Sequence, residues 1–232
     1  MNNPFSLATK SEQSVRVATW GPPKEGKTHL GLTFPGTKWY LDLDLGLDEL
    51  LGKFGLIDNP VLQRIKLFVP EEPSQAEAEK LLKEVLYAWK FAYEYASPGD
   101  SVICDTLSQV WQLCQIVYVE SADPKTKRFA YGPANRVMGG LLRRAAMREG
   151  VNSYWTNRQK AVFNGQGQET GFYQPNWWGE TGAAANIVLH VYQDRASKQN
   201  LATVEANRFD KDTHGLILPD VDYDMIRSLA YA

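Results

Sequence analysis

The chain has 232 residues, of which 44% are hydrophobic and 22% charged, and its formal net charge is −2. These values exclude a disordered or fibrous protein and fit one α/β domain with a substantial core. A nearly neutral chain is not held on nucleic acid by bulk charge alone, which leaves local basic loops for that purpose. No apolar run is long enough to span a bilayer and the start lacks signal-peptide features, so we expect no membrane partner.

Strands and helices are predicted to alternate over the first two thirds of the chain. Residues 1–13 are polar and irregular, which predicts a flexible arm followed by a single domain over residues 14–232. The predicted strands are Ser14–Trp20, Thr37–Leu43, Ile65–Val69, Ser101–Asp105 and Val151–Thr156. The predicted helices are Lys27–Phe34, Asp48–Phe54, Pro73–Tyr95, Thr106–Val119 and Ala134–Glu149.

The remaining segments are more polar. Ser121–Pro133 and residues 157–185 are predicted as loops, the second rich in Gly, Gln and aromatic residues. Asn186–Gln193 and Leu201–Arg208 are predicted to form a hairpin, and Pro219–Leu229 a short helix. Alternating strands and helices favour an α/β fold with a mainly parallel sheet flanked by helices, and the late hairpin adds an antiparallel extension at the C-terminal end.

Two cysteines, Cys104 and Cys114, lie in apolar surroundings. Neither has a partner at the spacing that metal ligands need. We therefore predict two reduced, buried thiols in a cytoplasmic protein.

A glycine-rich turn joins the first predicted strand to the first predicted helix. Its residues fit the pattern G-x-x-x-x-G-K-[ST] in full. In this P-loop pattern the backbone N–H groups face the β-phosphate, the lysine contacts the β- and γ-phosphates, and the hydroxyl binds Mg²⁺. The pattern alone gives false matches, but its place between a strand and a helix supports a site for ATP with Mg²⁺. The predicted nucleotide-binding residues are Gly21, Pro22, Pro23, Lys24, Glu25, Gly26, Lys27, Thr28 and His29.

A magnesium ion on a triphosphate also needs an acidic residue at the end of a neighbouring buried strand. Asp105 ends the apolar run that begins at Val102, so it is the best candidate, beside the hydroxyl of Thr28. The alternative is that Asp105 only caps the following helix. The two roles are compatible, and we predict Thr28 and Asp105 as the metal-binding pair.

Two carboxylates, Asp42 and Asp44, end the second predicted strand. Residues two apart on a strand face the same side, so one of them is expected to polarise the attacking water. We favour Asp44 as the catalytic base, acting with Lys27, and place Asp42 second. The alternative is a solvated strand end, or a cap for the helix near Asp48.

The segment Trp39–Leu50, W-Y-L-D-L-D-L-G-L-D-E-L, resembles the second-strand motif of RecA-type recombinases. In that family an aspartate is followed two residues later by a catalytic glutamate, and then by a glycine. Asp44 falls on the glutamate position, with aspartate in place of glutamate and one inserted residue before the glycine. The resemblance covers roughly residues 14–210 and implies a RecA-like P-loop NTPase core.

The resemblance continues downstream. The strand end around Asn157 and Gln159 looks like the place where RecA-type proteins put a phosphate-sensing residue, which implies one of these two. Gly182–His190 is similar to the end of the loop that contacts single-stranded DNA in that family. Tyr131-Gly132 resembles phage proteins of the Sak class, compact RecA-like cores proposed to act in single-strand annealing. The implied partners are single-stranded DNA, further copies of the chain and a single-strand-binding protein, in the host cytoplasm.

Two segments, Asp123–Arg136 and Arg158–Trp178, interleave basic and aromatic residues. This composition suits a groove that follows a nucleic acid backbone and stacks bases. The alternatives are a solvated face, or packing of the Trp177-Trp178 pair into the core or a subunit contact. The predicted DNA-binding residues are Lys125, Lys127, Arg128, Arg158, Lys160, Phe163, Tyr173 and Trp177.

Three functions are compatible with these patterns. The first is a DNA-dependent ATPase of the RecA type, acting on single-stranded DNA in phage recombination or annealing. The second is a P-loop kinase of a nucleotide or small acceptor, against which stands the lack of an arginine-rich lid. The third is a nucleotide-gated interaction module of a replication complex, which the aspartate at position 44 leaves open.

Overall fold

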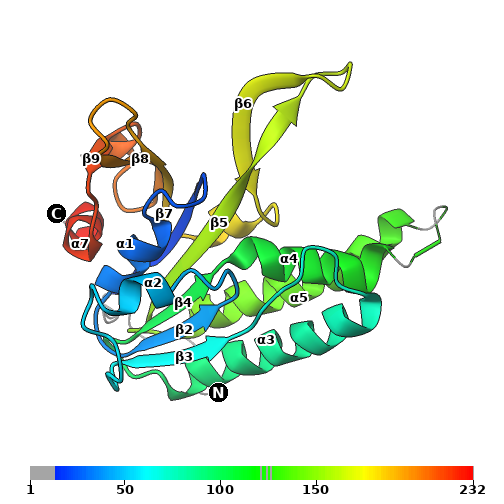
Figure 1. Cartoon of the computed structure of the whole chain (residues 1–232), viewed down its shortest axis with the longest axis horizontal. Coiled ribbons are helices and arrows are strands. Elements are labelled where there is room, and N and C mark those ends of the chain that lie inside the picture. The colour runs from blue at the N-terminus through cyan, green and yellow to red at the C-terminus, as the bar shows by residue number, and fades with distance from the viewer. Residues whose placement is uncertain (1–13, 121, 124, 126, 232) are drawn as a thin grey trace, which may run out of the picture.

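The computed structural model describes residues 14–120, 122, 123, 125 and 127–231, so the predicted arm at residues 1–13 lies outside the described residues. Within the described part, nine strands form one sheet (Figure 1). The strands are β1 Arg16–Gly21, β2 Lys38–Asp42, β3 Leu62–Lys66, β4 Ser101–Asp105, β5 Asn152–Phe163, β6 Glu169–Asn176, β7 Ile187–Gln193, β8 Asn200–Asn207 and β9 Ile217–Pro219. Their order is β3-β2-β4-β5-β1-β7-β8-β9, and β6 pairs with β5 outside this path.

The first six strands of this order are parallel, and β8 and β9 are antiparallel to their neighbours. This arrangement confirms the predicted parallel sheet with an antiparallel extension at the C-terminal end. Because the parallel strands run in one direction, the carboxyl ends of β1, β2, β4 and the parallel part of β5 meet at one edge. In open α/β sheets this edge is where ligands bind.

Helices cover both faces of the sheet (Figure 1). They are α1 Lys27–Thr33, α2 Asp48–Leu51, α3 Gln75–Tyr95, α4 Leu107–Gln115, α5 Lys127–Met147, α6 Thr181–Ala184 and α7 Tyr223–Tyr231. The helices α3, α4 and α5 share one buried cluster with the sheet, and α1 and α7 share another. A π-helical turn, Ile116–Glu120, follows α4. No helix in the described part of the chain is long and apolar enough to cross a bilayer.

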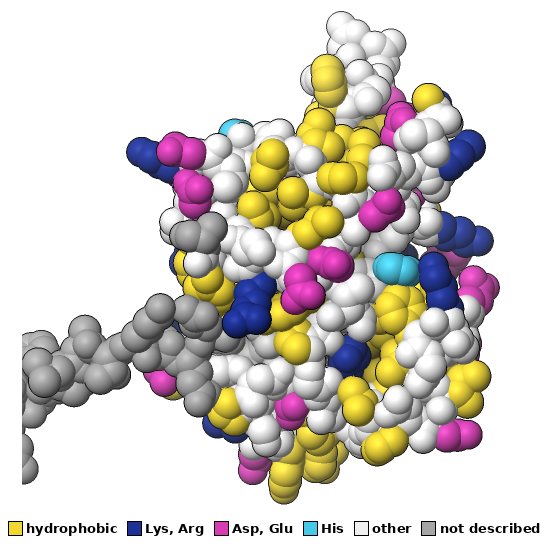
Figure 2. All heavy atoms as spheres, turned by 90° about the vertical axis from the view of Figure 1, so that its left-hand side faces the viewer, with side chains coloured by type: hydrophobic (Ala, Val, Ile, Leu, Met, Phe, Trp, Pro, Cys, Tyr) yellow, Lys and Arg dark blue, Asp and Glu magenta, His cyan; other side chains and the backbone are white. Residues whose placement is uncertain are grey.

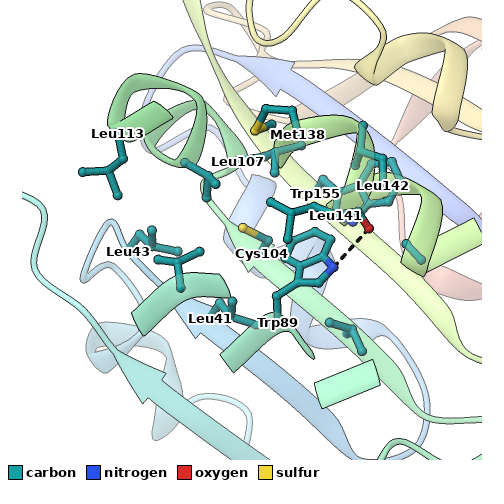
Figure 3. Packing of buried hydrophobic residues seen from close by; sticks show 14 of the residues in the cluster. Leu41, Leu43, Trp89, Cys104, Leu107, Leu113, Met138, Leu141, Leu142 and Trp155 are labelled. Carbon is teal, nitrogen blue, oxygen red and sulfur yellow. Dashed lines mark hydrogen bonds between the residues drawn. The ribbon is translucent and has the colours of Figure 1, made fainter. Parts of the chain in front are cut away.

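Trp89 occupies the centre of the larger core, between α3, α5 and the sheet (Figure 3). Its side chain is fully buried, and its indole Nε1 donates a hydrogen bond of 3.2 Å to the carbonyl oxygen of Leu141. Cys104 lies in the same cluster, and both it and Cys114 are buried and free, as predicted. The indole therefore ties α3 to α5 while filling the space above β4.

We expect the Trp89→Ala substitution to lower the free energy of unfolding by about 3–5 kcal/mol, the usual cost of truncating a buried tryptophan. Chemical denaturation followed by circular dichroism measures this loss. The matched control is Tyr87→Ala on the same helix, because Tyr87 is 69% exposed and its removal should change stability little. Equal stability of the two variants would contradict the packing described for Trp89.

The predicted loop Ser121–Pro133 is wrong in its second half, because α5 begins at Lys127 and contains Pro133. A proline inside a helix is locally unfavourable, so the sequence suggests a boundary there. Ala134 and Met138 are fully buried in the same core as Leu113 of α4. This packing supports the helix across the proline.

The predicted loop at residues 157–185 is also wrong. The strand β5 continues to Phe163 and pairs with the antiparallel strand β6, which makes a hairpin that extends away from the body (Figure 1). Its turn is closed by Asn164, whose side-chain oxygen accepts from the backbone N–H of Gln166 at 2.9 Å. The outer part of the hairpin packs neither face against the core, so its residues lack the alternating hydrophobic pattern by which strands are predicted.

The left-hand side of the view in Figure 1, where α7 lies, faces the reader in Figure 2. Hydrophobic side chains gather in patches there, with acidic and basic side chains interspersed (Figure 2). The mixture on this face agrees with the net charge of −2.

Candidate nucleotide-binding site

The P-loop connects β1 to α1, as the sequence predicts. Gly21 and Gly26 have φ angles of 149° and 94°, a region that other residues rarely adopt. A Cβ atom on Gly21 would lie 1.9 Å from the carbonyl oxygen of Val191. The two glycines are therefore required by the backbone path and by its close approach to β7.

The ammonium of Lys27 lies inside this loop. It donates to the carbonyl oxygen of Gly21 at 3.0 Å and also contacts that of Pro22. Burial lowers the pKa of Lys27, and the carboxylates of Asp105, Glu25 and Asp44 act in the opposite direction. The ammonium thus lies where both predicted functional carboxylates, Asp105 and Asp44, influence it.

Thr28 and Asp105 lie together. The hydroxyl of Thr28 donates a hydrogen bond of 2.7 Å to Oδ2 of Asp105, and the hydroxyl of Tyr40 donates to the same oxygen at 2.7 Å. Thr156 donates to the other oxygen, Oδ1. The structure therefore brings the predicted metal-binding pair into direct contact.

Asp105 does not cap the following helix. The N-cap of α4 is Thr106, whose hydroxyl accepts a hydrogen bond of 3.3 Å from the backbone N–H of Ser108. This result excludes the capping alternative for Asp105. The residue is 3% exposed, and its carboxylate is surrounded by hydroxyl groups. Tyr40 and Thr156, which hold this carboxylate, were not predicted, because β2 and β5 approach it only in the folded sheet.

The two aspartates at the end of β2 have different environments. Asp42 is fully buried and its carboxylate contacts Arg64, which also pairs with Asp48 at 2.5 Å. Asp44 is exposed, and its backbone N–H donates to the carbonyl oxygen of Asp105 at 3.1 Å. Asp44 therefore has the solvent access that a base for water needs, beside the carboxylate predicted to bind the metal.

The guanidinium of Arg158 lies at this site. It forms an ion pair with Asp44, and the backbone N–H of Arg158 donates to the hydroxyl of Ser108 at 2.9 Å. The side-chain amide of Gln109, oriented to satisfy both ends, accepts from Arg158 at 3.0 Å and donates to the carbonyl of Leu43 at 3.0 Å. Arg158 was predicted only as a DNA contact, whereas its guanidinium lies against the proposed base.

The two predicted phosphate-sensing residues, Asn157 and Gln159, lie on either side of Arg158 in β5. Asn157 is fully buried, and its amide donates to the carbonyl oxygens of Thr19 at 3.0 Å and Trp155 at 3.3 Å. Its own Oδ1 has no hydrogen-bond partner in the described part of the chain. Gln159 is half-buried. The sensing role of either residue stays a prediction.

A hollow of about 270 Å³ borders the P-loop at Gly26 and His29. Its other walls include Lys53, Asn200 and Asp220. The His29 ring meets Phe54 edge-on, with ring centroids 4.7 Å apart. The hollow thus offers a mixed apolar and polar space next to the residues that would hold phosphates.

Comparisons with known proteins address the fold. No protein-family model matches the chain, and no curated protein matches it either. Among solved structures, the chain is similar to the crystal structure of the RadB recombinase, with a TM-score of 0.53 and 16% sequence identity over 90% of this chain and 87% of that one. The fold is RecA-like.

The hairpin formed by β5 and β6 carries most of the predicted DNA-binding residues of the second segment. Phe163, Phe172 and Tyr173 are 57%, 73% and 52% exposed. Lys160, also exposed, pairs in register with Gln174, and Ala161 pairs with Tyr173. Neighbouring positions on a strand face opposite sides, so Lys160 and Tyr173 present a cation and a ring on opposite faces of the hairpin.

Trp177 and Trp178 lie at the base of the hairpin and are half-buried against the larger core. The indole of Trp178 donates to Oδ1 of Asn135 at 2.9 Å. A Cβ atom on Gly182 would lie 3.2 Å from the ring of Trp177. These contacts favour the packing alternative for the pair, and a DNA contact by Trp177 stays a prediction.

The first predicted DNA-binding segment leads into α5. Lys125 is exposed, and its backbone N–H donates to Oδ1 of Asp123 at 2.8 Å. Lys127 is exposed at the first position of α5, and Arg128 follows it in the helix. DNA binding by either segment stays a prediction.

Proposed function

We propose that the chain is a RecA-like ATPase that binds ATP with Mg²⁺ and acts on single-stranded DNA in recombination or annealing. The observation that carries the proposal is the direct hydrogen bond between Thr28 of the P-loop and Asp105 of β4. A hydroxyl and a carboxylate in this arrangement are the ligands that Mg²⁺ takes when phosphates and water complete its shell. When bound, the ion neutralises the charge that develops on the phosphates.

Lys27 and Asp44 account for the remaining chemistry. The ammonium of Lys27 stabilises negative charge on the β- and γ-phosphates. Asp44 is the exposed carboxylate beside Asp105, and we assign it the orientation and activation of the attacking water. The hollow beside His29 has space for the base of the nucleotide.

The hairpin of β5 and β6 is the proposed contact to single-stranded DNA. Its exposed rings can stack on bases of any sequence, and Lys160 can pair with a phosphate. Arg158 lies at the root of the same hairpin and forms an ion pair with Asp44, so one residue of β5 connects the proposed DNA contact to the proposed base. The structural neighbour is a recombinase, which agrees with this class of function.

We expect the Lys160→Ala/Tyr173→Ala variant to bind single-stranded DNA about 10- to 100-fold more weakly, because one stacked base alone contributes about 1–3 kcal/mol. Fluorescence anisotropy with a labelled oligothymidylate measures the affinity. The matched control removes one exposed aromatic and one exposed cation elsewhere, in Tyr87→Ala/Arg195→Ala. An unchanged affinity of the hairpin variant, or an equal loss in the control, would contradict the assignment.

A nucleotide-gated module that hydrolyses little is the second candidate, because Arg158 holds the proposed base in an ion pair. Measuring released phosphate against ATP bound separates the two: an ATPase turns over, whereas a gated module retains its nucleotide. A kinase would instead phosphorylate an acceptor. Assembly into a homo-oligomer, a single-strand-binding protein as partner, a phage origin and the host cytoplasm remain predictions of the resemblance.

A further inference from the structure

Three arginines meet at a second hollow, far from the P-loop. It measures about 390 Å³ and lies between the ends of α3 and α5. Its lining residues are Tyr93, Gly140, Arg143, Arg144, Met147 and Arg148. Arg143 and Arg144 are exposed, whereas Arg148 is half-buried. From sequence alone these arginines are explained as a solvated or subunit-facing surface, with an arginine finger to a neighbouring subunit's nucleotide as the alternative.

Among the described residues, the three guanidiniums have no acidic partners. Within the described part of the chain, none of them forms an ion pair with a carboxylate. Arg148 donates to the carbonyl oxygen of Ala96 at 2.6 Å, and its Nε is buried without an acceptor. A buried donor without an acceptor is costly, so the side chain of Arg148 would gain by turning toward an anion in the hollow that it lines.

The positive surface continues around the end of the sheet. Arg16 donates to the carbonyl oxygen of Ala184 at 3.1 Å, and Arg208 donates to that of Ala183. Both arginines thus contact the end of α6, and neither has a carboxylate partner among the described residues. Arg16 pairs in register with Ser153, whose hydroxyl accepts a hydrogen bond of 2.8 Å from Tyr93, a residue that lines the hollow. Five arginines therefore cluster in a chain whose net charge is −2.

This surface is separate from the nucleotide site and from the hairpin. Arg16 begins β1 and Gly21 ends it at the P-loop. Five steps along a strand of about 3.3 Å per residue place the two ends about 17 Å apart. The hollow and the hairpin are also separated along β5. Arg148 lies just before β5 begins, whereas the hairpin lies beyond the opposite end of the parallel part of this strand.

We propose that Arg16, Arg143, Arg144, Arg148 and Arg208 form a second nucleic acid site, which binds the sugar–phosphate backbone of a strand. Guanidinium groups match phosphate oxygens in a two-pronged geometry, which explains arginine at all five positions. Among its lining residues the hollow offers no exposed aromatic ring for stacking, since Tyr93 is 2% exposed. Its contacts therefore go to the sugar–phosphate backbone, which every sequence shares. The function of the site rests on the proposed function: two sites on opposite ends of the sheet let one chain hold two strands, as annealing requires.

The test uses the full chain with the hairpin variant Lys160→Ala/Tyr173→Ala as background, so that the second site is measured alone. In this background we expect an oligothymidylate to retain salt-sensitive binding, and Arg143→Glu/Arg144→Glu to weaken it at least tenfold. Each lost phosphate contact should reduce the slope of log K against log salt by about 0.7. The control Arg195→Glu/Lys198→Glu changes the net charge equally on the β7–β8 turn and should have little effect.

A second variant fills the hollow without changing its charge. Apart from its chain neighbours and the backbone of its own helix, no described heavy atom lies within 4 Å of the position where Gly140 would carry a Cβ, so Gly140→Leu fits the helix and occupies the space. We expect this variant to weaken binding several-fold.

The proposal is overturned if neither variant weakens binding, if the charge control weakens it equally, or if an acidic peptide binds the surface in preference to the oligonucleotide. Nucleotide binding is measured in the same preparations, and the DNA response of the native hairpin is measured with Arg143→Glu/Arg144→Glu in an otherwise native chain. If the second-site variants do not weaken binding but the native hairpin still responds to DNA, the second site is rejected and the proposed function stands. If the second-site variants weaken binding but the hairpin shows no response to DNA, only the hairpin assignment is rejected.

Discussion

We expect the Lys27→Ala variant to lose ATP hydrolysis and to bind ATP about 10- to 150-fold more weakly, which corresponds to one charged hydrogen bond of about 1.5–3 kcal/mol. The reason is the position of the ammonium, which is held inside the P-loop by the carbonyl of Gly21 and lies near Asp105 and Asp44. Titration calorimetry measures the affinity, and phosphate release measures the rate.

The matched control for this experiment is Lys83→Ala, which removes an exposed lysine from α3. It should leave both quantities unchanged. If ATP affinity and hydrolysis survive in Lys27→Ala, the nucleotide site lies elsewhere and the P-loop assignment is wrong.

Asp44 is the proposed catalytic base. We expect Asp44→Asn to slow hydrolysis by about 10²–10⁴-fold, the usual contribution of a general base, with ATP affinity preserved. Single-turnover measurement of phosphate release separates this chemical step from binding. The amide keeps the size of the side chain and removes the charge, so the surrounding packing is maintained.

Asp42→Asn is the informative comparison. Asp42 is fully buried against Arg64, so loss of its charge leaves that guanidinium with Asp48 alone. We expect this variant to lose stability toward denaturant while its folded fraction retains most of its turnover. Unchanged hydrolysis in Asp44→Asn together with loss in Asp42→Asn would move the base to Asp42.

The sequence is sufficient to predict those parts of the site that depend on neighbouring residues in the chain. The P-loop is a continuous motif whose glycines are needed at two backbone positions, and Asp105 ends an apolar run that favours a buried strand. Since the carboxyl ends of parallel strands meet at one edge, the proximity of Thr28, Asp44 and Asp105 follows from the predicted sheet.

The remaining features depend on contacts between distant segments. Tyr40 and Thr156 hold Asp105 across two neighbouring strands, which no local pattern reveals. The outer hairpin lacks a buried face, so it has no hydrophobic period, and Arg158 could not be assigned to Asp44 before the order of β2, β4 and β5 was known. Pro133 suggested a helix end that core packing overrides.

The rate of ATP hydrolysis with and without single-stranded DNA, at low and at moderate salt, tests the proposed function in one experiment. The proposed function predicts a rate that rises with DNA, and a stimulation that weakens as salt screens the phosphate contacts. A rate that does not respond to DNA, in a protein that still binds ATP, would contradict it and favour a kinase or a nucleotide-gated partner protein.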